Sequence, residues 1–174
     1  METKIKIPED IEVKKEDHGV VVSQGDKEVR NKLTHPLVSI EIDDEEVAIK
    51  AKRQDKKVKG VIGTFASKIK SAIRGLEENY QAKLKILYRH FPMNVKVNGN
   101  VLKVTNFLGE KSPREVEITD GVQVKVDDEE IYVEGPDKEK VGQTAARIEQ
   151  KIQASNKKDR RVFNDGIYIV EKAK

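Results

Sequence analysis

One short pattern occurs twice in this 174-residue chain. The sequence IDDEEVAIKA at positions 42–51 returns 84 positions later as VDDEEIYVEG at 126–135. Each copy is followed by a helical pattern with apolar residues at i, i+4, i+7 and i+11, and these two patterns lie 83 positions apart. One residue gained or lost in the loop before the helix explains the difference, because solvated loops tolerate changes in length. The repeat therefore predicts two similar structural units.

Both halves have the same predicted order: several short strands, an acidic hairpin, one strand and one helix. Apolar residues alternate in LVSIEI and VAIKA, which is typical of an antiparallel sheet with one face covered and one solvated. Helices are expected at 56–79 and 137–154. Strands are expected at 4–7, 11–14, 19–24, 28–33, 37–42 and 46–51, and at 84–90, 93–98, 101–107, 114–118, 122–126, 130–133 and 166–170. The predicted fold class is α+β, with two tandem similar domains that each pack one helix on a small antiparallel sheet.

The expected domains are residues 1–80 and residues 81–174. A domain of this size buries only about 60 to 65 % of its unfolded surface, so each core must be small. Charged residues make up 37 % of the chain and aromatic residues 5 %, which agrees with a thin core under a strongly solvated surface.

The composition also predicts where the protein works. The chain has no cysteine, which agrees with a reducing cytosol. The N-terminal sequence METKIKIPED has no apolar signal region, and no run approaches the ~20 apolar residues that cross a bilayer. We therefore expect a soluble, cytoplasmic protein without a membrane partner.

The two acidic tetrads, 43–46 and 127–130, lie between alternating runs and are expected at hairpin tips. Aspartate supports turns, and charge keeps a sheet edge soluble. Calcium loops need spaced ligands and a central glycine, which both tetrads lack. The tetrads are therefore interpreted as turns, and no metal site is predicted.

Basic residues are segregated along the chain, which says more than the net charge of +3. No acid occurs between positions 78 and 110, and further basic stretches occupy 50–59 and 157–161. Their bases are Lys83, Lys85, Arg89, Lys96 and Lys103; Lys50, Lys52, Arg53, Lys56, Lys57 and Lys59; and Lys157, Lys158, Arg160 and Arg161. One such cluster is typical of any solvated face, but three favour a polyanion-binding surface, and hence nucleic acid.

Catalytic interpretations find little support. The three histidines, His18, His35 and His90, show no i, i+4 pair, and no GxGxxG or GxSxG motif occurs. The sequence GEKS at 109–112 lacks the glycine spacing of a phosphate-binding loop. We expect neither an enzyme nor a cofactor.

Four motifs, HFPMNVKV, NFLGEKSPREV, GPDKEKVGQTAARIEQ and RRVFNDGIYIVEK, occur in this order. They resemble the universal large-subunit ribosomal protein six family in its archaeal and eukaryotic form. The resemblance covers essentially the whole chain and is strongest over 88–172. It implies two similar sheet-and-helix domains, a structural place on large-subunit ribosomal RNA beside other ribosomal proteins and near the docking region of the translational GTPases, and no enzymatic activity.

The resemblance also implies that the RNA-facing surface lies mainly in the C-terminal domain. Lysine and arginine would meet phosphates, glycines would allow a close backbone approach, and the N-terminus of the second helix would offer amides to a phosphate. The candidate RNA-binding residues are Lys111, Arg114, Gly135, Lys138, Gln143, Lys157, Lys158, Arg160, Arg161, Asn164, Gly166 and Lys172. Phe163 is expected in the core or against a sugar or base, with the core favoured.

A second class of function stays open at this point. Two tandem domains could form a protein-interaction module whose basic patches only increase solubility. The two hypotheses differ in the partner they require, because the first predicts that the chain travels with large ribosomal subunits and the second predicts that it does not.

Overall fold

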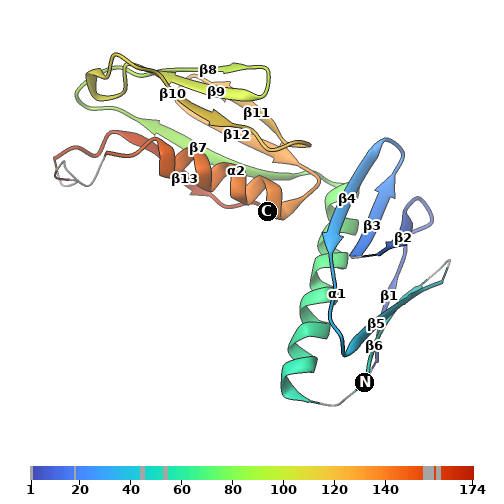
Figure 1. Cartoon of the computed structure of the whole chain (residues 1–174). Helices are drawn as coiled ribbons and strands as arrows, with labels where there is room; N and C mark the ends of the chain where they lie inside the picture. The colour runs from blue at the N-terminus through green and yellow to red at the C-terminus, as the bar shows by residue number, and fades with distance from the viewer. Residues whose placement is uncertain (1, 18, 44–45, 53–54, 155–158, 160–161) are drawn as a thin grey trace. The chain divides into compact units, whose positions relative to one another are not determined.

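The computed structural model describes residues 2–17, 19–43, 46–52, 55–154, 159 and 162–174. The chain forms two compact units, Met1–Asn79 and Tyr80–Lys174, called unit 1 and unit 2 below. Each unit combines antiparallel strands with one α-helix (Figure 1). The α+β class predicted from the repeat is confirmed. No helix among the described residues is long and apolar enough to cross a membrane.

In unit 1, two three-stranded antiparallel sheets pack against helix α1 (Lys56–Glu77). One sheet has the order β1-β6-β5 and the other the order β2-β3-β4. The strands separate into two sheets because hairpin β5–β6 returns to pair with β1 instead of continuing from β4. Their bounds are β1 (Glu2–Lys6), β2 (Glu12–Glu16), β3 (Gly19–Gln24), β4 (Lys27–Lys32), β5 (Val38–Ile42) and β6 (Glu46–Ala51).

Unit 2 repeats this plan and adds one strand. β12 pairs with β7 as β6 pairs with β1, the meander β8-β9-β10 corresponds to β2-β3-β4, and β13 extends the main sheet to the order β11-β12-β7-β13. Helix α2 (Lys138–Lys151) packs against this sheet and β10. The bounds are β7 (Tyr80–Leu87), β8 (Asn94–Asn98), β9 (Val101–Thr105), β10 (Arg114–Glu117), β11 (Gln123–Asp127), β12 (Glu130–Gly135) and β13 (Gly166–Glu171), with the 3-10 turn η1 (Phe107–Gly109) after β9.

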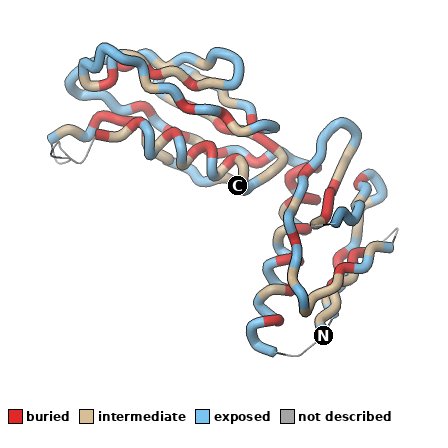
Figure 2. The backbone as a smooth tube through the Cα atoms, viewed as in Figure 1, coloured by how far each residue is buried: buried red, intermediate tan, exposed pale blue. Residues whose placement is uncertain are grey.

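The apolar positions that repeat in the two helical sequence patterns are buried in both units. The four apolar positions on each helix are all at most 8 % exposed, and along both tubes the buried positions recur on one side of the helix (Figure 2). They are Val58, Ile62, Phe65 and Ile69 in α1, and Val141, Ala145 and Ile148 in α2 with Ile152 at its C-cap. The duplication seen in the sequence is therefore a duplication of the two cores.

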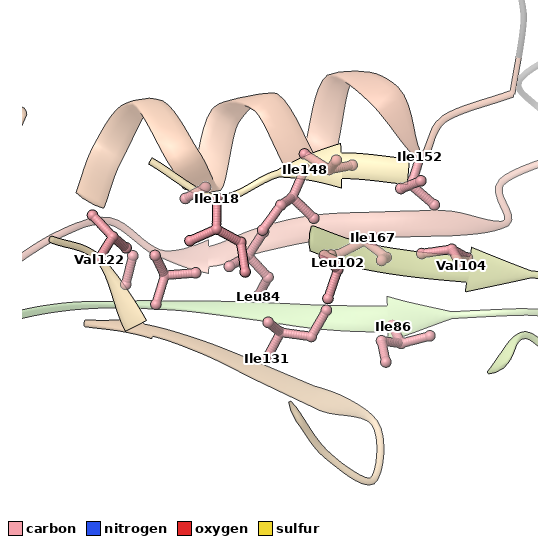
Figure 3. Packing of buried hydrophobic residues seen from close by; sticks show 14 of the residues in the cluster. Leu84, Ile86, Leu102, Val104, Ile118, Val122, Ile131, Ile148, Ile152 and Ile167 are labelled. Atoms are coloured by element: carbon pink, nitrogen blue, oxygen red, sulfur yellow. The ribbon is translucent and has the colours of Figure 1, made fainter. Parts of the chain in front are cut away.

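The core of unit 2 fixes the strand ends that carry its loops. Ile148 of α2 and Ile152 at its C-cap belong to the buried cluster that includes Leu84 of β7, Ile131 of β12 and Leu102 of β9 (Figure 3). All five side chains are fully buried. Burying a branched aliphatic side chain stabilises the folded state by about 1.5 to 3 kcal/mol. This cluster therefore holds β7, β9 and α2 together, and with them the loops that follow these elements.

Candidate nucleic-acid interface

Three loops come together at the end of unit 2 where β7 stops. Gly166, the first residue of β13, pairs with Leu87, the last residue of β7, so the chain leaves one strand and enters the other at the same place. The three loops are residues 88–93, 106–113 and 152–165, and we call their described residues the loop face. The Asn106 side chain ties the first two loops by donating to the carbonyl of Pro92 at 2.9 Å.

A buried carboxylate joins the first loop to the third. The fully buried side chain of Asp165 accepts from the backbone N–H of His90 at 3.1 Å and lies 3.0 Å from His90 Nδ1. Burial would raise the pKa of Asp165, but hydrogen bonds from the side chain and backbone of His90 and the backbone of Arg89 hold it below its ordinary value. The His90 ring also lies 5.0 Å from the ring of half-buried Phe163. Phe163 is thus partly buried beside another aromatic ring and is not a member of the buried core cluster.

Arg114 holds the second loop against the end of α2. Its Nε and Nη2 donate to the two carboxylate oxygens of Glu110 at 2.8 and 2.7 Å. Its Nη1 donates to the carbonyls of Lys151 and Gln153 at 2.7 and 3.0 Å, where the helix ends. Its guanidinium carbon lies 4.1 Å from the ring centre of Phe107. These contacts use most of its donors, so Arg114 serves the fold, and a direct phosphate contact from it stays a prediction.

The loop around η1 has an unusual backbone. Asn106, Leu108 and Gly109 all have positive φ, at 61°, 49° and 76°. A leucine in this region is strained by about 1 to 2 kcal/mol, and such strain persists only where the surroundings impose it. The conformation places Phe107 in the core at 1 % exposure and leaves Lys111 exposed. Phe107 therefore anchors this loop to the core of unit 2.

Only part of the predicted set of RNA-binding residues gathers on the loop face. Lys111 and Asn164 are exposed there, with Arg114 and Gly166 at its border. Four predicted residues, Lys157, Lys158, Arg160 and Arg161, lie outside the described residues.

The remaining candidates lie away from the loop face. Gly135 pairs with Tyr80 at the start of β7, and Lys138 follows at the start of α2 with its Nζ 5.5 Å from the Tyr80 ring centre. Lys172 follows the end of β13, which runs back toward the same end. Eight residues of β7 separate the two ends, a span of roughly 25 Å. Gln143 is exposed between them on α2. The predicted residues therefore do not form one site.

At the Tyr80 end, acidic groups compete with a phosphate. Asp137 caps α2, since its carboxylate accepts from the backbone N–H groups of Glu139 at 2.9 Å and Lys140 at 3.4 Å. These are amides that the predicted phosphate at this helix N-terminus would need. A carboxylate already provides the negative charge that the helix dipole favours, so the structure gives no support to phosphate binding at this position.

The two candidate glycines are required by packing inside the protein. A Cβ on Gly166 would lie 2.6 Å from the carbonyl oxygen of Ile152, and a Cβ on Gly135 would lie 3.0 Å from that of Gly121. Both residues are buried. Their lack of a side chain serves contact between segments of unit 2, and a role toward RNA stays a prediction.

Two lysines of the acid-free stretch form ion pairs with glutamates from other strands of unit 2. Lys83 pairs with Glu130 at 2.8 Å and Lys103 with Glu115 at 3.3 Å, in both cases across neighbouring strands. Arg89 is exposed on the loop face itself. Lys85 of β7 and Lys96 of β8 are exposed as well, so the exposed positive charge of this stretch lies on its strands and at its loop.

Several residues of the loop face were missed by sequence reasoning. Tyr88 and Phe91 each keep 46 % of their surface exposed, and His90 and Asp165 form the pair described above. The signal for the aromatic residues was present, since both fall in the acid-free stretch. The pair had no local signal, because its partners lie 75 positions apart. No group of three potential metal ligands occurs in the part of the chain that the structure describes.

The fold and this face together define a duplicated two-domain α+β protein with a candidate nucleic-acid interface in its second domain. A family model described as "Ribosomal protein L6" matches residues 91–166. Three archaeal relatives share the name "Large ribosomal subunit protein uL6". The chain is 43 % identical to the protein of Methanococcus vannielii over 97 % of this chain and 92 % of the relative. It is 45 % identical to that of Methanosarcina mazei (97 % and 96 %) and 41 % identical to that of Haloarcula marismortui (97 % and 94 %). The chain belongs to the ribosomal protein L6 family.

Proposed function

We propose that this protein is a structural constituent of the large ribosomal subunit, where it binds large-subunit ribosomal RNA and catalyses no reaction. The observation that carries the proposal is identity of 41 to 45 % over nearly the whole chain with proteins named for that subunit. Similarity over both units favours a shared assembly role rather than one shared domain. A free protein-interaction module would not account for it.

The loop face is the principal RNA contact in this proposal. Arg89 and Lys111 are exposed there, and the acids beside them are engaged, since Glu110 is bound by Arg114 and Asp165 is buried. The basic residues Lys157, Lys158, Arg160 and Arg161 lie outside the described residues, and their contact with RNA stays a prediction from the sequence. At the Tyr80 end, by contrast, Asp137 and Glu139 lie close to Lys138 in the chain. Phosphate binding depends on net positive potential, which favours the loop face over the other end.

The family resemblance supports two further parts of the proposal. It implies neighbouring large-subunit proteins as partners, and a position near the docking region of the translational GTPases. Crosslinking from the ribosome-bound chain tests both parts. We expect crosslinks to other large-subunit proteins, and to a GTPase when it is trapped on the ribosome with a non-hydrolysable GTP analogue. Absence of the GTPase crosslink from positions in both units would contradict that neighbourhood.

Sedimentation tests the assembly role directly. In a high-salt gradient of cell extract, the full-length protein should migrate with large ribosomal subunits, because a structural constituent stays bound when loosely attached proteins are released. Migration only at the mass of a free chain would overturn the proposal and support the free interaction module.

Salt dependence tests the RNA contact and its position. Each phosphate that the protein neutralises should contribute about −0.7 to −0.9 to the slope of log affinity against log salt. Replacing Arg160 and Arg161 by Gln, or Arg89 and Lys111 by Gln, should therefore weaken binding to large-subunit ribosomal RNA and flatten the slope by about one to two units. Replacing Lys138 and Lys172 by Gln provides the matched control at the Tyr80 end, with a smaller change expected. Equal effects at both ends would contradict the preference for the loop face.

A further inference from the structure

Exposed apolar side chains concentrate at one end of unit 2. Five large apolar residues of the described chain stay exposed, and four of them lie on or directly beside the loop face: Leu87, Tyr88, Phe91 and Val162. Two are aromatic rings in a single loop. Solvent exposure of rings is costly, so such a group marks an interaction surface.

The protein holds this loop in place from several sides. The Phe91 ring packs on Gly109, with ring atoms 3.6 to 3.9 Å from where a Cβ of that glycine would lie. Asp165 holds His90 through the backbone and the ring. Asn106 holds Pro92 through its carbonyl. A loop tied at three successive residues loses little freedom on binding, which makes its exposed rings effective in recognition.

The chemistry around the rings favours RNA over a protein partner. No acid occurs between positions 78 and 110, and exposed Arg89 lies between the two rings in sequence. Lys111 is exposed on the neighbouring loop, which Phe91 contacts through Gly109. Aromatic rings flanked by cations are the surface that unpaired nucleic-acid bases require, because every base has a π-face and a phosphate beside it.

We propose that the loop at 88–93 is a stacking platform for unpaired bases of RNA. Tyr88 and Phe91 stack on bases, while Arg89 and Lys111 hold the adjacent phosphates. The ligand is therefore a loop, bulge or single-stranded segment rather than a regular duplex, whose bases are already stacked. This inference rests on the proposed function and adds the class of RNA structure that is recognised.

The test uses the full-length protein and three RNA probes. The first probe is a short single strand that contains 2-aminopurine, whose fluorescence is quenched when it stacks on a ring. The second is the same strand with abasic positions, and the third is the corresponding duplex. The variants are Phe91→Leu and Tyr88→Leu, with Tyr88→Phe as the conservative variant that keeps a ring. Val170→Ala is the matched control, because Val170 is exposed on β13 away from the loop.

The parent should quench the probe and bind the single strand more tightly than the abasic strand or the duplex. Phe91→Leu and Tyr88→Leu should each lower affinity for the single strand by at least about fivefold and reduce quenching, since one base stacked on a ring contributes about 1 to 3 kcal/mol. Tyr88→Phe and Val170→Ala should match the parent. Unchanged thermal unfolding shows that the variants fold.

Other results overturn the proposal in distinguishable ways. If the parent binds all three probes equally, or Phe91→Leu keeps the preference for bases, the platform is wrong. Retained binding to ribosomal RNA with a steep salt slope would then leave the proposed function intact. Absence of binding to any RNA would contradict both. If Phe91→Leu binds RNA normally but no longer sediments with large subunits, the rings contact a neighbouring protein instead of a base.

Discussion

His90 and Asp165 are 75 positions apart in the chain and are joined by two contacts in the structure, at 3.1 Å through the His90 backbone N–H and at 3.0 Å through its Nδ1. Replacing Asp165 by Asn removes the buried charge and places amide hydrogens where an acceptor is needed. We expect this variant to lose about 1 to 3 kcal/mol of unfolding free energy in urea denaturation. Glu129→Gln is the control, because that carboxylate is exposed at a hairpin tip. Equal stability of parent and Asp165→Asn would show that the pair contributes nothing.

The same pair predicts how stability changes in acid. The pKa of Asp165 is lowered in the folded protein from its ordinary value of 3.8, although burial opposes this, because His90 and the backbone of Arg89 donate hydrogen bonds to the charged form. A lowered pKa means that protonation favours unfolding. The contribution of the Asp165 carboxylate to the free energy of unfolding is therefore complete above pH 3.8 and is lost as the pH falls through its lowered pKa in the folded protein.

Urea unfolding of the parent and Asp165→Asn at a series of pH values measures this effect. The difference in unfolding free energy should be present at about pH 4 and shrink as the pH falls further. A difference that grows as the pH falls below about 4 would mean that the folded-state pKa of Asp165 is raised, which would contradict the geometry of the pair.

Arg114 offers a test that separates structure from RNA contact. Lysine keeps the charge but cannot bind both oxygens of Glu110 and the carbonyl groups at the end of α2 at once. Arg114→Lys should therefore lower the unfolding free energy by about 1 to 3 kcal/mol. Lys111→Gln, exposed on the same loop, should change it by less than about 0.5 kcal/mol.

A double-mutant cycle with Glu110→Gln measures the pairwise part of this contribution. We expect a coupling free energy of about 0.5 to 3 kcal/mol between Arg114 and Glu110, because the two side chains share two hydrogen bonds. If Arg114→Lys instead left stability unchanged and weakened RNA binding, Arg114 would be a phosphate contact, as the sequence predicted.

The fold was largely predictable because its information is local. Alternation and helical phase depend only on neighbouring residues. Val47 and Ile131, at equivalent places in the two copies, could therefore both be assigned to a core, and both are 0 % exposed. The start of β7 was missed. A strand was expected at 84–90, whereas β7 begins at Tyr80, only three residues after α1 ends. The alternation of apolar and polar residues in KLKI extends back through YQA, with Tyr80 and Ala82 buried, so the sequence did contain a signal for the earlier start, and pairing with β12 begins at Tyr80.

The candidate site was less predictable because charge order in a sequence does not give position in space. Lys111 and Lys138 belong to motifs of one family, yet the fold places them at opposite ends of unit 2. Glu110 takes the donors of Arg114, and Asp137 takes the amides of α2, and neither contact has a period that a sequence pattern could show. What the sequence did indicate was the acid-free stretch in which Tyr88 and Phe91 lie.

Two glycines of the chain should respond to alanine in opposite directions. Gly63 is exposed in the interior of α1, and a Cβ there would meet nothing within 4 Å. Alanine loses less backbone entropy than glycine in a helix, so Gly63→Ala should raise the unfolding free energy by about 0.5 to 1 kcal/mol.

Gly166 has no such space, because a Cβ would lie 2.6 Å from the carbonyl oxygen of Ile152, which also accepts from the N–H of Ile167 at 3.1 Å. Gly166→Ala must therefore separate β13 from the end of α2 and should lower stability by about 1 to 3 kcal/mol. Urea unfolding of both variants beside the parent measures the two signs, and a Gly166→Ala variant as stable as the parent would show that this close approach is not required.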